Sequence, residues 1–184
     1  MRTPSRFALR PVALALACMG MAAPAFAQLP TWNNFAVRGG SATVGSGLNH
    51  LPLTAAGVPS ATGTILPITQ GSQRAIIDWQ GFSIGPGNAV NISQPGATSV
   101  LLNRVTGNEL STIAGSMTAN GRVFLVNPNG VLFSNGASVN VGGLVASSLK
   151  MATTDADFMG GSERLVFRQD GSTAGTVENR GSIT

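Results

Sequence analysis

Short apolar runs alternate with clusters of turn-forming residues along most of the chain beyond residue 70. The runs are rich in Val, Ile and Leu, which β-strands favour, and they stop at Gly, Pro or Asn. Because only 10% of the residues are charged, long surface helices are not expected. We therefore expect an all-β protein with strands at residues 75–79, 82–84, 89–92, 99–105, 122–126, 131–133, 138–141 and 144–146.

The turns between these strands recur too closely for the longer strands of a typical β-sandwich. Asn-Gly pairs begin at residues 120, 129 and 135, and tight turns need residues that accept a positive φ. Asn and Gly at corners, with Val, Ile or Leu between them, favour a β-solenoid of stacked rungs. Residues 176–184 have the pattern of one more rung that is begun and not finished, so we expect a longer native protein or a truncated form.

Three stretches fit the repeating pattern less well. Residues 48–69 are rich in Ala, Gly, Pro and Thr, and we expect a β cap or hairpin over the first rung. Residues 109–119 lack strand alternation at 111–114, which favours one helical turn. Residues 150–164 carry several acidic side chains and are expected to form a loop that protrudes from the rungs.

The N-terminus has the three parts of a secretory signal peptide. Arg2, Arg6 and Arg10 are basic, residues 11–23 are almost entirely apolar, and residues 25–27 are Ala-Phe-Ala. The apolar run is too short to span a membrane as a helix. We expect residues 1–27 to be a signal peptide cleaved between Ala27 and Gln28, and residues 28–184 to be one domain. Lipidation at Cys18 is the less favoured alternative, because residues 15–17 make a poor lipobox.

Removal of the signal peptide changes the charge balance. Three of the 11 Lys and Arg residues leave with it, so eight remain against seven Asp and Glu, a net charge of +1. Nucleic-acid binding therefore loses its electrostatic basis. The mature chain also loses Cys18, its only cysteine. One hypothesis is that a chain that must stay unfolded in the oxidising periplasm benefits from having no disulfide to form early. The alternative is that the fold simply needs no disulfides.

The residues give little support to an enzyme. His50 is the only histidine, so a Ser-His-Asp triad and a zinc site both lack partners. Asp155, Asp157 and Glu163 are grouped, as in β-helical polysaccharide enzymes, but they fall in the expected loop. Residues 170–172 match half of a calcium loop. We predict no catalytic, cofactor or metal site.

The segment Asn127-Pro128-Asn129-Gly130 has the composition of a strong β-turn. The Asn127 side chain is placed to bond the backbone two residues on, Pro128 presets φ, and Gly130 suits the last position. Taken alone, this segment predicts local geometry and nothing more.

The surrounding residues resemble the two-partner secretion domain of filamentous-haemagglutinin-like exoproteins, in the adhesin subgroup. The segments that carry the resemblance are residues 79–85, 94–96, 102–107, 120–133, 136–148 and 157–158, and the likeness extends from Thr31 to Thr184.

This resemblance implies a right-handed parallel β-helix with an N-terminal β cap and extra-helical hairpins or loops. It implies export through the periplasm to the cell surface, with an outer-membrane β-barrel transporter as partner whose periplasmic POTRA domains bind the chain. It also implies that the parent exoprotein is an adhesin or haemagglutinin, which would carry any host-cell or glycan receptor binding. No membrane-spanning segment and no nucleic-acid partner are expected.

The resemblance also assigns the site residues. Asn127, Pro128, Asn129 and Gly130 match the family's secretion motif. A second motif, Asn-Pro-Asn-Leu, occurs in some members and is missing from this sequence. Its general region holds an accessory candidate segment instead, formed by Asn103, Arg104, Val105, Thr106 and Gly107.

Two other functions remain open at this point. The first is a stand-alone module that binds carbohydrate or host cells. Binding of carbohydrate or host cells by isolated residues 28–184 would establish this function. The second is a β-helical enzyme that acts on polysaccharides, which would need a cleft with paired acidic residues.

Overall fold

The computed structural model describes residues 29–30, 34–45, 49–52, 62–169 and 175–184, and this part of the chain is almost entirely β-structure. Its strands are β1 (Phe35–Gly39), β2 (Ala42–Val44), β3 (Asn49–Pro52), β4 (Thr62–Gln70), β5 (Arg74–Trp79), β6 (Ala89–Ser93), β7 (Val100–Val105), β8 (Ser111–Ile113), β9 (Ser116–Val126), β10 (Val131–Phe133), β11 (Ser138–Ser147), β12 (Lys150–Met151), β13 (Phe167–Arg168), β14 (Val177–Asn179) and β15 (Ser182–Ile183), and its helix is α1 (Asp155–Met159). The predicted cleavage site at Ala27 and Gln28 lies outside the described residues.

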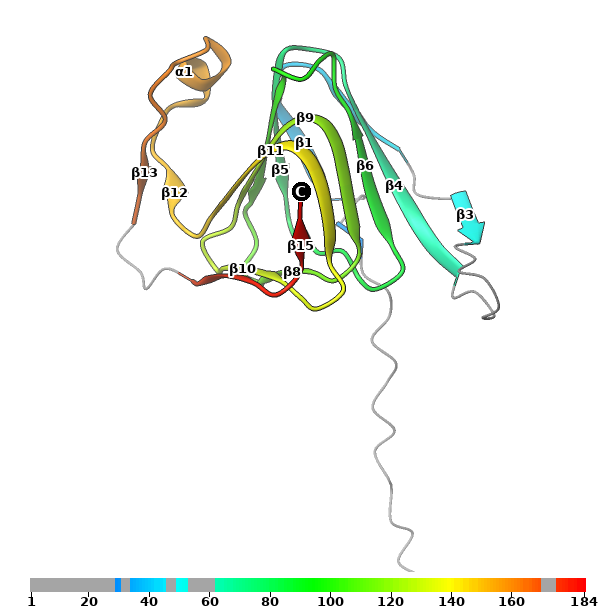
Figure 1. Ribbon diagram of the computed structural model, residues 1–184. Coiled ribbons are helices and arrows are strands. Elements are labelled where there is room, and N and C mark those ends of the chain that lie inside the picture. The colour runs from blue at the N-terminus through cyan, green and yellow to red at the C-terminus, as the bar shows by residue number, and fades with distance from the viewer. Residues whose placement is uncertain (1–28, 31–33, 46–48, 53–61, 170–174) are drawn as a thin grey trace, which may run out of the picture.

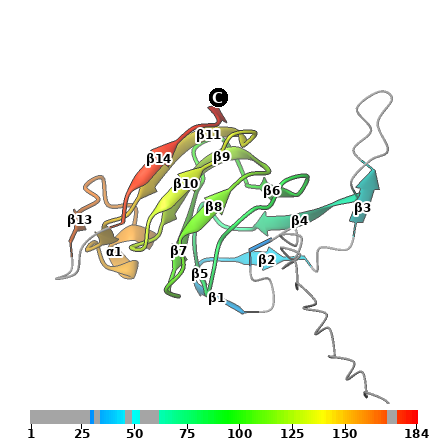
Figure 2. The ribbon, with the colours of Figure 1, turned by 90° about the horizontal axis from the view of Figure 1, so that it is seen from below.

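The strands stack in parallel on three faces of a solenoid (Figure 1). Face A contains β5, β7 and the second halves of β9 and β11. Face B contains β4, β6, the first halves of β9 and β11, and β15. Face C contains β8, β10 and β14, which lie side by side in Figure 2. One rung is one pass over the three faces, and the predicted parallel β-helix is confirmed.

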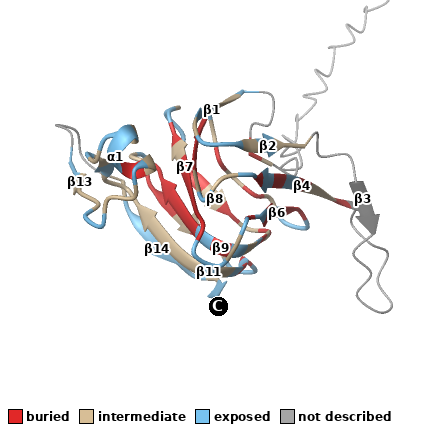
Figure 3. Cartoon of the chain, turned by 90° about the horizontal axis from the view of Figure 1, so that it is seen from above, coloured by how far each residue is buried: buried red, intermediate tan, exposed pale blue. Residues whose placement is uncertain are grey.

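Apolar side chains fill the space between the three faces. On face A, Leu101 pairs in register with Ala75 on one side and Val123 on the other, and all three are fully buried. Face B contributes Val90 and face C contributes Val131 to the same cluster. Figure 3 shows the buried positions running through the middle of the stack, whereas the C-terminal tail is exposed. Because each inward residue packs on its counterparts in adjacent rungs, the stability of a rung depends on its neighbours.

Antiparallel strands close the N-terminal end of the solenoid. β1 pairs with β5 on face A, and β2 and β3 pair with β4 on face B. These pairings cover the strand edges of the first rung, which would otherwise be free to pair with another chain. The expected β cap over the first rung is therefore present, and β3 and β4 form a hairpin within residues 48–69.

The expectation of a helical turn within residues 109–119 is wrong. Residues 111–113 form β8 and residue 116 begins β9. The sequence concealed this strand because its two inward residues are Ser111 and Ile113, so a polar residue stands where an apolar one is expected. The inward position suits Ser111, since its hydroxyl accepts a buried hydrogen bond from Asn127.

Other strand predictions need smaller corrections. Residues 82–84 form no strand, and Ile84 makes only an isolated bridge to Ile113. Residues 138–141 and 144–146 belong to one strand, β11, which turns the corner from face B to face A. The predicted final rung is present in the described tail, where β14 and β15 extend faces C and B.

Residues 150–169, here called the strap, lie outside the rungs. They contain a two-stranded sheet and a helix, where the sequence predicted a protruding loop at residues 150–164. β12 pairs with β13, and α1 lies between them with Thr154 as its N-cap. Figure 1 shows this unit beside the strands of face A. It covers the outer side of that face, so the strands of face A are buried on both sides.

Truncation of the inward column should be costly. In Leu101→Ala, loss of a fully buried side chain between Ala75 and Val123 is expected to lower the free energy of unfolding by about 2–5 kcal/mol. Asn140→Ala, at an exposed position of β11, is the control and should change it by about 0.5 kcal/mol or less. Urea unfolding of both variants measures the difference, and equal stabilities would contradict the assigned core.

Candidate functional site

The turn at residues 127–130 connects β9 on face A to β10 on face C. The Gly130 N–H donates to the Asn127 carbonyl oxygen at 2.9 Å, which closes the β-turn. Asn127 Oδ1 accepts from the backbone N–H of Asn129 at 3.0 Å. Gly130 has a φ of 112°, a conformation that favours glycine. The predicted turn geometry is therefore present.

Asn127 is completely buried, and its hydrogen bonds reach the rungs on both sides. Its Nδ2 donates to the carbonyl oxygen of Glu109 at 2.9 Å and to the Ser111 hydroxyl at 2.9 Å, both in the preceding rung. Its backbone N–H donates to the Ser147 carbonyl oxygen at 2.9 Å, in the following rung. Both side-chain N–H groups are used, so the amide is satisfied inside the protein.

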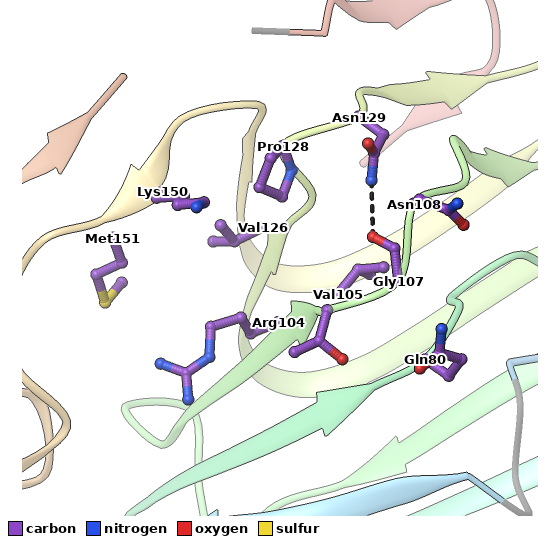
Figure 4. Close-up of a pocket in the computed structure, with 11 residues that line it drawn as sticks. Gln80, Arg104, Val105, Gly107, Asn108, Val126, Pro128, Asn129, Lys150 and Met151 are labelled. Atoms are coloured by element: carbon purple, nitrogen blue, oxygen red, sulfur yellow. Dashed lines mark hydrogen bonds between the residues drawn. The ribbon is translucent and has the colours of Figure 1, made fainter. Parts of the chain in front are cut away.

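The accessible part of the motif is small. Gly130 is buried like Asn127, whereas Pro128 is half-buried and Asn129 is exposed. Asn129 Nδ2 donates to the Gly107 carbonyl oxygen at 2.9 Å, a contact visible in Figure 4. Solvent or a partner therefore meets the motif mainly at Pro128 and Asn129.

The accessory segment 103–107 lies in the rung below and is joined to the motif through Gly107. Asn103 is fully buried within face A, where its Oδ1 accepts from the Trp79 indole N–H at 3.0 Å and its Nδ2 donates to the Phe124 carbonyl oxygen at 3.3 Å. Thr106 Oγ1 donates to the Trp79 carbonyl oxygen at 3.0 Å. The structure thus brings the two predicted segments together, with Val105 in the core beside them.

Arg104 faces outward from the same strand and forms two ion pairs. Its guanidinium lies 2.7 Å from Asp78 and 2.8 Å from Asp155 of α1. Burial alone would lower the pKa of Arg104, but the hydrogen bonds and negative charges of Asp155 and Asp78 outweigh it and raise that pKa. Arg104 is therefore a permanent cation held between two carboxylates.

A cavity of about 730 Å³ lies between the motif, the accessory segment and the strap (Figure 4). Its apolar lining includes Val105, Val126, Pro128 and Met151. Its polar lining consists of Gln80, Arg104, Thr106, Asn108, Asn129 and Lys150, together with Gly107. No carboxylate is among these lining residues, so the cavity lacks the paired acids of a glycoside hydrolase.

The grouped acidic residues of the strap have structural contacts. Asp155 pairs with Arg104, and Asp157 Oδ2 accepts from the Thr154 hydroxyl at the start of α1. Within the described residues, no three His, Cys, Asp or Glu side chains are placed to hold a metal ion. Among the helices in the same part of the chain, none is long and apolar enough to cross a membrane.

Sequence reasoning missed three partners of the site. The polar Asn103 inside an apolar run signalled a buried hydrogen bond, although nothing identified Trp79 as its donor. The inward Ser111 and the pairing of Arg104 with Asp155 had no signal in the sequence, because both depend on how rungs and strap stack.

Comparison with known proteins places this geometry in a family. The sequence model of the TPS secretion domain matches residues 49–183. The chain belongs to the TPS secretion domain family. Membership makes it a secretion domain of an exported protein, and the family implies an outer-membrane transporter as partner.

Individual relatives agree with this family. The chain is 45% identical over 91 residues to a heme/hemopexin-binding protein of Haemophilus influenzae, and 47% identical over 89 residues to the protein of that name from the Rd strain. The matches cover 50% and 48% of this chain, respectively. The crystal structure of the HMW1 secretion domain from Haemophilus influenzae has a TM-score of 0.63 and 29% identity, with 80% of this chain covered.

The relatives are much longer than the matched region. The chain spans 10% of the length of the two heme/hemopexin-binding proteins and 34% of the HMW1 chain. None of these three descriptions names an enzymatic activity.

Replacement of the buried motif amide should destabilise the fold. In Asn127→Asp, a carboxylate oxygen would face the Glu109 carbonyl and a buried charge would lack a cationic partner, at a cost of about 3 kcal/mol or more. Asn129→Asp, at the exposed position of the same turn, should cost about 1 kcal/mol or less. Urea unfolding compares the two, and equal losses would show that the buried amide has no special role.

The accessory segment should be sensitive to added volume at Gly107. A Cβ there would overlap the Gln80 carbonyl oxygen of the adjacent rung, so we expect Gly107→Ala to lower the free energy of unfolding by about 1–3 kcal/mol. Gly96→Ala is the matched control, because nothing lies within 4 Å of its added Cβ. Thermal unfolding of both checks this, and a stable Gly107→Ala would contradict the close approach of the two rungs.

Proposed function

We propose that this chain is the secretion-targeting domain of a larger exoprotein and that the Asn127–Gly130 turn serves export by determining the fold. Residues 1–27 direct the chain across the inner membrane and are removed between Ala27 and Gln28. The POTRA domains of an outer-membrane β-barrel partner then bind the arriving chain in the periplasm, and the domain folds at the cell surface. The observation that carries the proposal is the buried Asn127 side chain, in a chain that matches the TPS secretion domain.

The burial of Asn127 favours a folding role over direct recognition. A partner that met the folded domain would reach Pro128 and Asn129 and not the Asn127 amide, whose two N–H groups are bonded to residues 109 and 111. Recognition in the periplasm therefore involves the extended chain before these bonds form. An extended segment is suited to bind by adding a strand to the edge of a POTRA sheet.

The solenoid is suited to folding in the direction of export. Each rung docks on its predecessor, so rungs can form one after another as the chain emerges. Asn127 bonds first to the rung before it and then, through its backbone N–H, to Ser147 of the rung after it. Each completed turn makes backward movement through the transporter less favourable without any nucleotide.

The activity of the parent exoprotein is a separate matter. We propose an adhesin or haemagglutinin at the cell surface, with any host-cell or glycan receptor bound by regions beyond this domain. The identity of 45% to a heme/hemopexin-binding protein favours heme or hemopexin binding as a second candidate for the parent.

A secretion assay tests the role of the turn. With the partner transporter co-expressed, Asn127→Asp should leave the chain in the periplasm and lower the amount at the surface or in the medium severalfold. Leu101→Ala is the matched comparison, because it destabilises the same fold outside the motif. If the turn acts through folding, secretion of the two variants should fall together with their measured stability.

Two results would decide against the proposal. Normal secretion of Asn127→Asp would remove the motif from export altogether. A much larger loss for Asn127→Asp than for an equally destabilised Leu101→Ala would show direct recognition of the motif and contradict the folding role. Capture of the urea-unfolded chain by purified POTRA domains tests the partner separately, and no capture would overturn that part of the proposal.

A further inference from the structure

The outer side of face A is apolar, unlike the outer side of face B. Ile76, Leu102 and Phe124 are successive outward positions of face A and form a stripe across three strands, joined by Val100 and Val126. The corresponding outward positions of face B are Asn91, Thr118 and Asn140, all exposed. An apolar stripe of this kind on the outside of a solenoid needs a cover.

The strap is that cover. Phe158 of α1 is fully buried against the stripe, with its ring centroid 6.3 Å from that of Phe124 and 5.3 Å from the Arg74 guanidinium carbon. Met151, Met159, Leu165 and Phe167 pack on the same cluster. The strap therefore adds a second, smaller core outside the rungs.

One ion-pair network ties the strap to face A at the edge of this small core. The Arg104 guanidinium binds Asp155 of α1 through two bonds, of 2.8 and 3.2 Å, and also binds Asp78 of β5 at 2.7 Å. Asp155 is half-exposed, whereas Asp78 is nearly buried. Arg38 of β1, which is exposed, also pairs with Asp78, at 2.9 Å. The Arg104–Asp155 pair is the link of this network that reaches the strap, and its Asp155 end is half-exposed.

The strap's backbone is organised independently of the rungs. β12 and β13 form a separate two-stranded sheet, and Ala152 N–H donates to the Val166 carbonyl oxygen within the strap. Thr154 caps α1, and the Phe158 N–H donates back to the Thr154 carbonyl oxygen. The strap also follows β11 in the chain, so all four strands of face A precede it.

We propose that the strap is a lid that closes over face A after the rungs have formed and opens without unfolding them. The Arg104–Asp155 ion pair stabilises its closed position. Its place in export rests on the proposed secretion function: in N-to-C emergence the apolar stripe is uncovered until residues 150–169 arrive. The opening itself is a property of the folded domain and is testable without any transporter. A failure of the lid therefore leaves the export proposal intact.

Hydrogen exchange of the full chain, followed by mass spectrometry in low urea, tests the lid. In the wild type, amides of α1, β12 and β13 should exchange through a local opening that β5, β7 and β9 do not share. Asp155→Asn should speed exchange of the strap about threefold to tenfold and leave the rungs unchanged. Glu163→Gln is the matched control: it removes one negative charge from the strap but makes no ion pair with Arg104.

Salt and a core variant complete the test. Added salt should speed strap exchange in Glu163→Gln more than in Asp155→Asn, because only the former keeps the half-exposed ion pair for salt to screen.

Phe158→Ala should expose the stripe, raise binding of an apolar dye and remove strap protection while the rungs stay protected. Equal effects of Asp155→Asn and Glu163→Gln on strap exchange would overturn the role of the Arg104–Asp155 ion pair in holding the lid closed. Loss of protection in strap and rungs together in Phe158→Ala would overturn the lid.

Discussion

Satisfying backbone polar groups where the chain turns between faces is the constraint on which the solenoid depends. Within a face, parallel strands pair their own N–H and C=O groups, but corners break that ladder and leave groups that must find other partners. Asn127 resolves this at the corner between faces A and C, where its Nδ2 reaches the Glu109 carbonyl one rung below. At another corner, Asn120 accepts from the Gln94 N–H and donates to the Gln94 carbonyl oxygen. Carboxamide side chains, which donate and accept at once, are therefore the residues that align one rung on the next.

Burial on two sides is a second constraint, and it limits the charged residues of face A. Face A is buried on both sides, by the central core and by the strap, so apolar residues predominate in its strands. The two polar residues of β7 have different partners. Asn103 points inward and is satisfied by Trp79 and Phe124, and Arg104 points outward and is satisfied by two carboxylates. Each of the two ties face A to a different neighbour, so the accessory segment joins the core on one side to the strap on the other.

How far the sequence predicted this structure follows from the range of the interactions. The strand at 75–79 and the turn at 127–130 depend on local preferences, and both were predicted from residue type alone. β8 was missed because its inward Ser111 has its buried hydrogen-bond partner, Asn127, 16 residues away in the sequence. The ordered strap was taken for a loop because Phe158 and Asp155 acquire partners only from face A, and the Arg104–Asp155 contact spans 51 residues. When a contact between rungs is made by single polar residues, it produces no periodic pattern in the sequence from which it could be predicted.

The burial of Asn127 bears on how a secretion motif can be short and yet specific. A recognition element presented on the surface would depend on its exposed side chains, here Pro128 and Asn129, and would tolerate change at buried ones. A fold-determining turn has the opposite dependence, because the buried amide has bonding partners in the preceding rung while its backbone holds the following one. A substitution at Asn127 therefore removes bonds to the preceding rung and within the turn, at the position whose backbone N–H is bonded to the following rung. Since solenoid stability is a sum of neighbouring terms, a defect at one corner weakens the contact between the rungs before it and those after it.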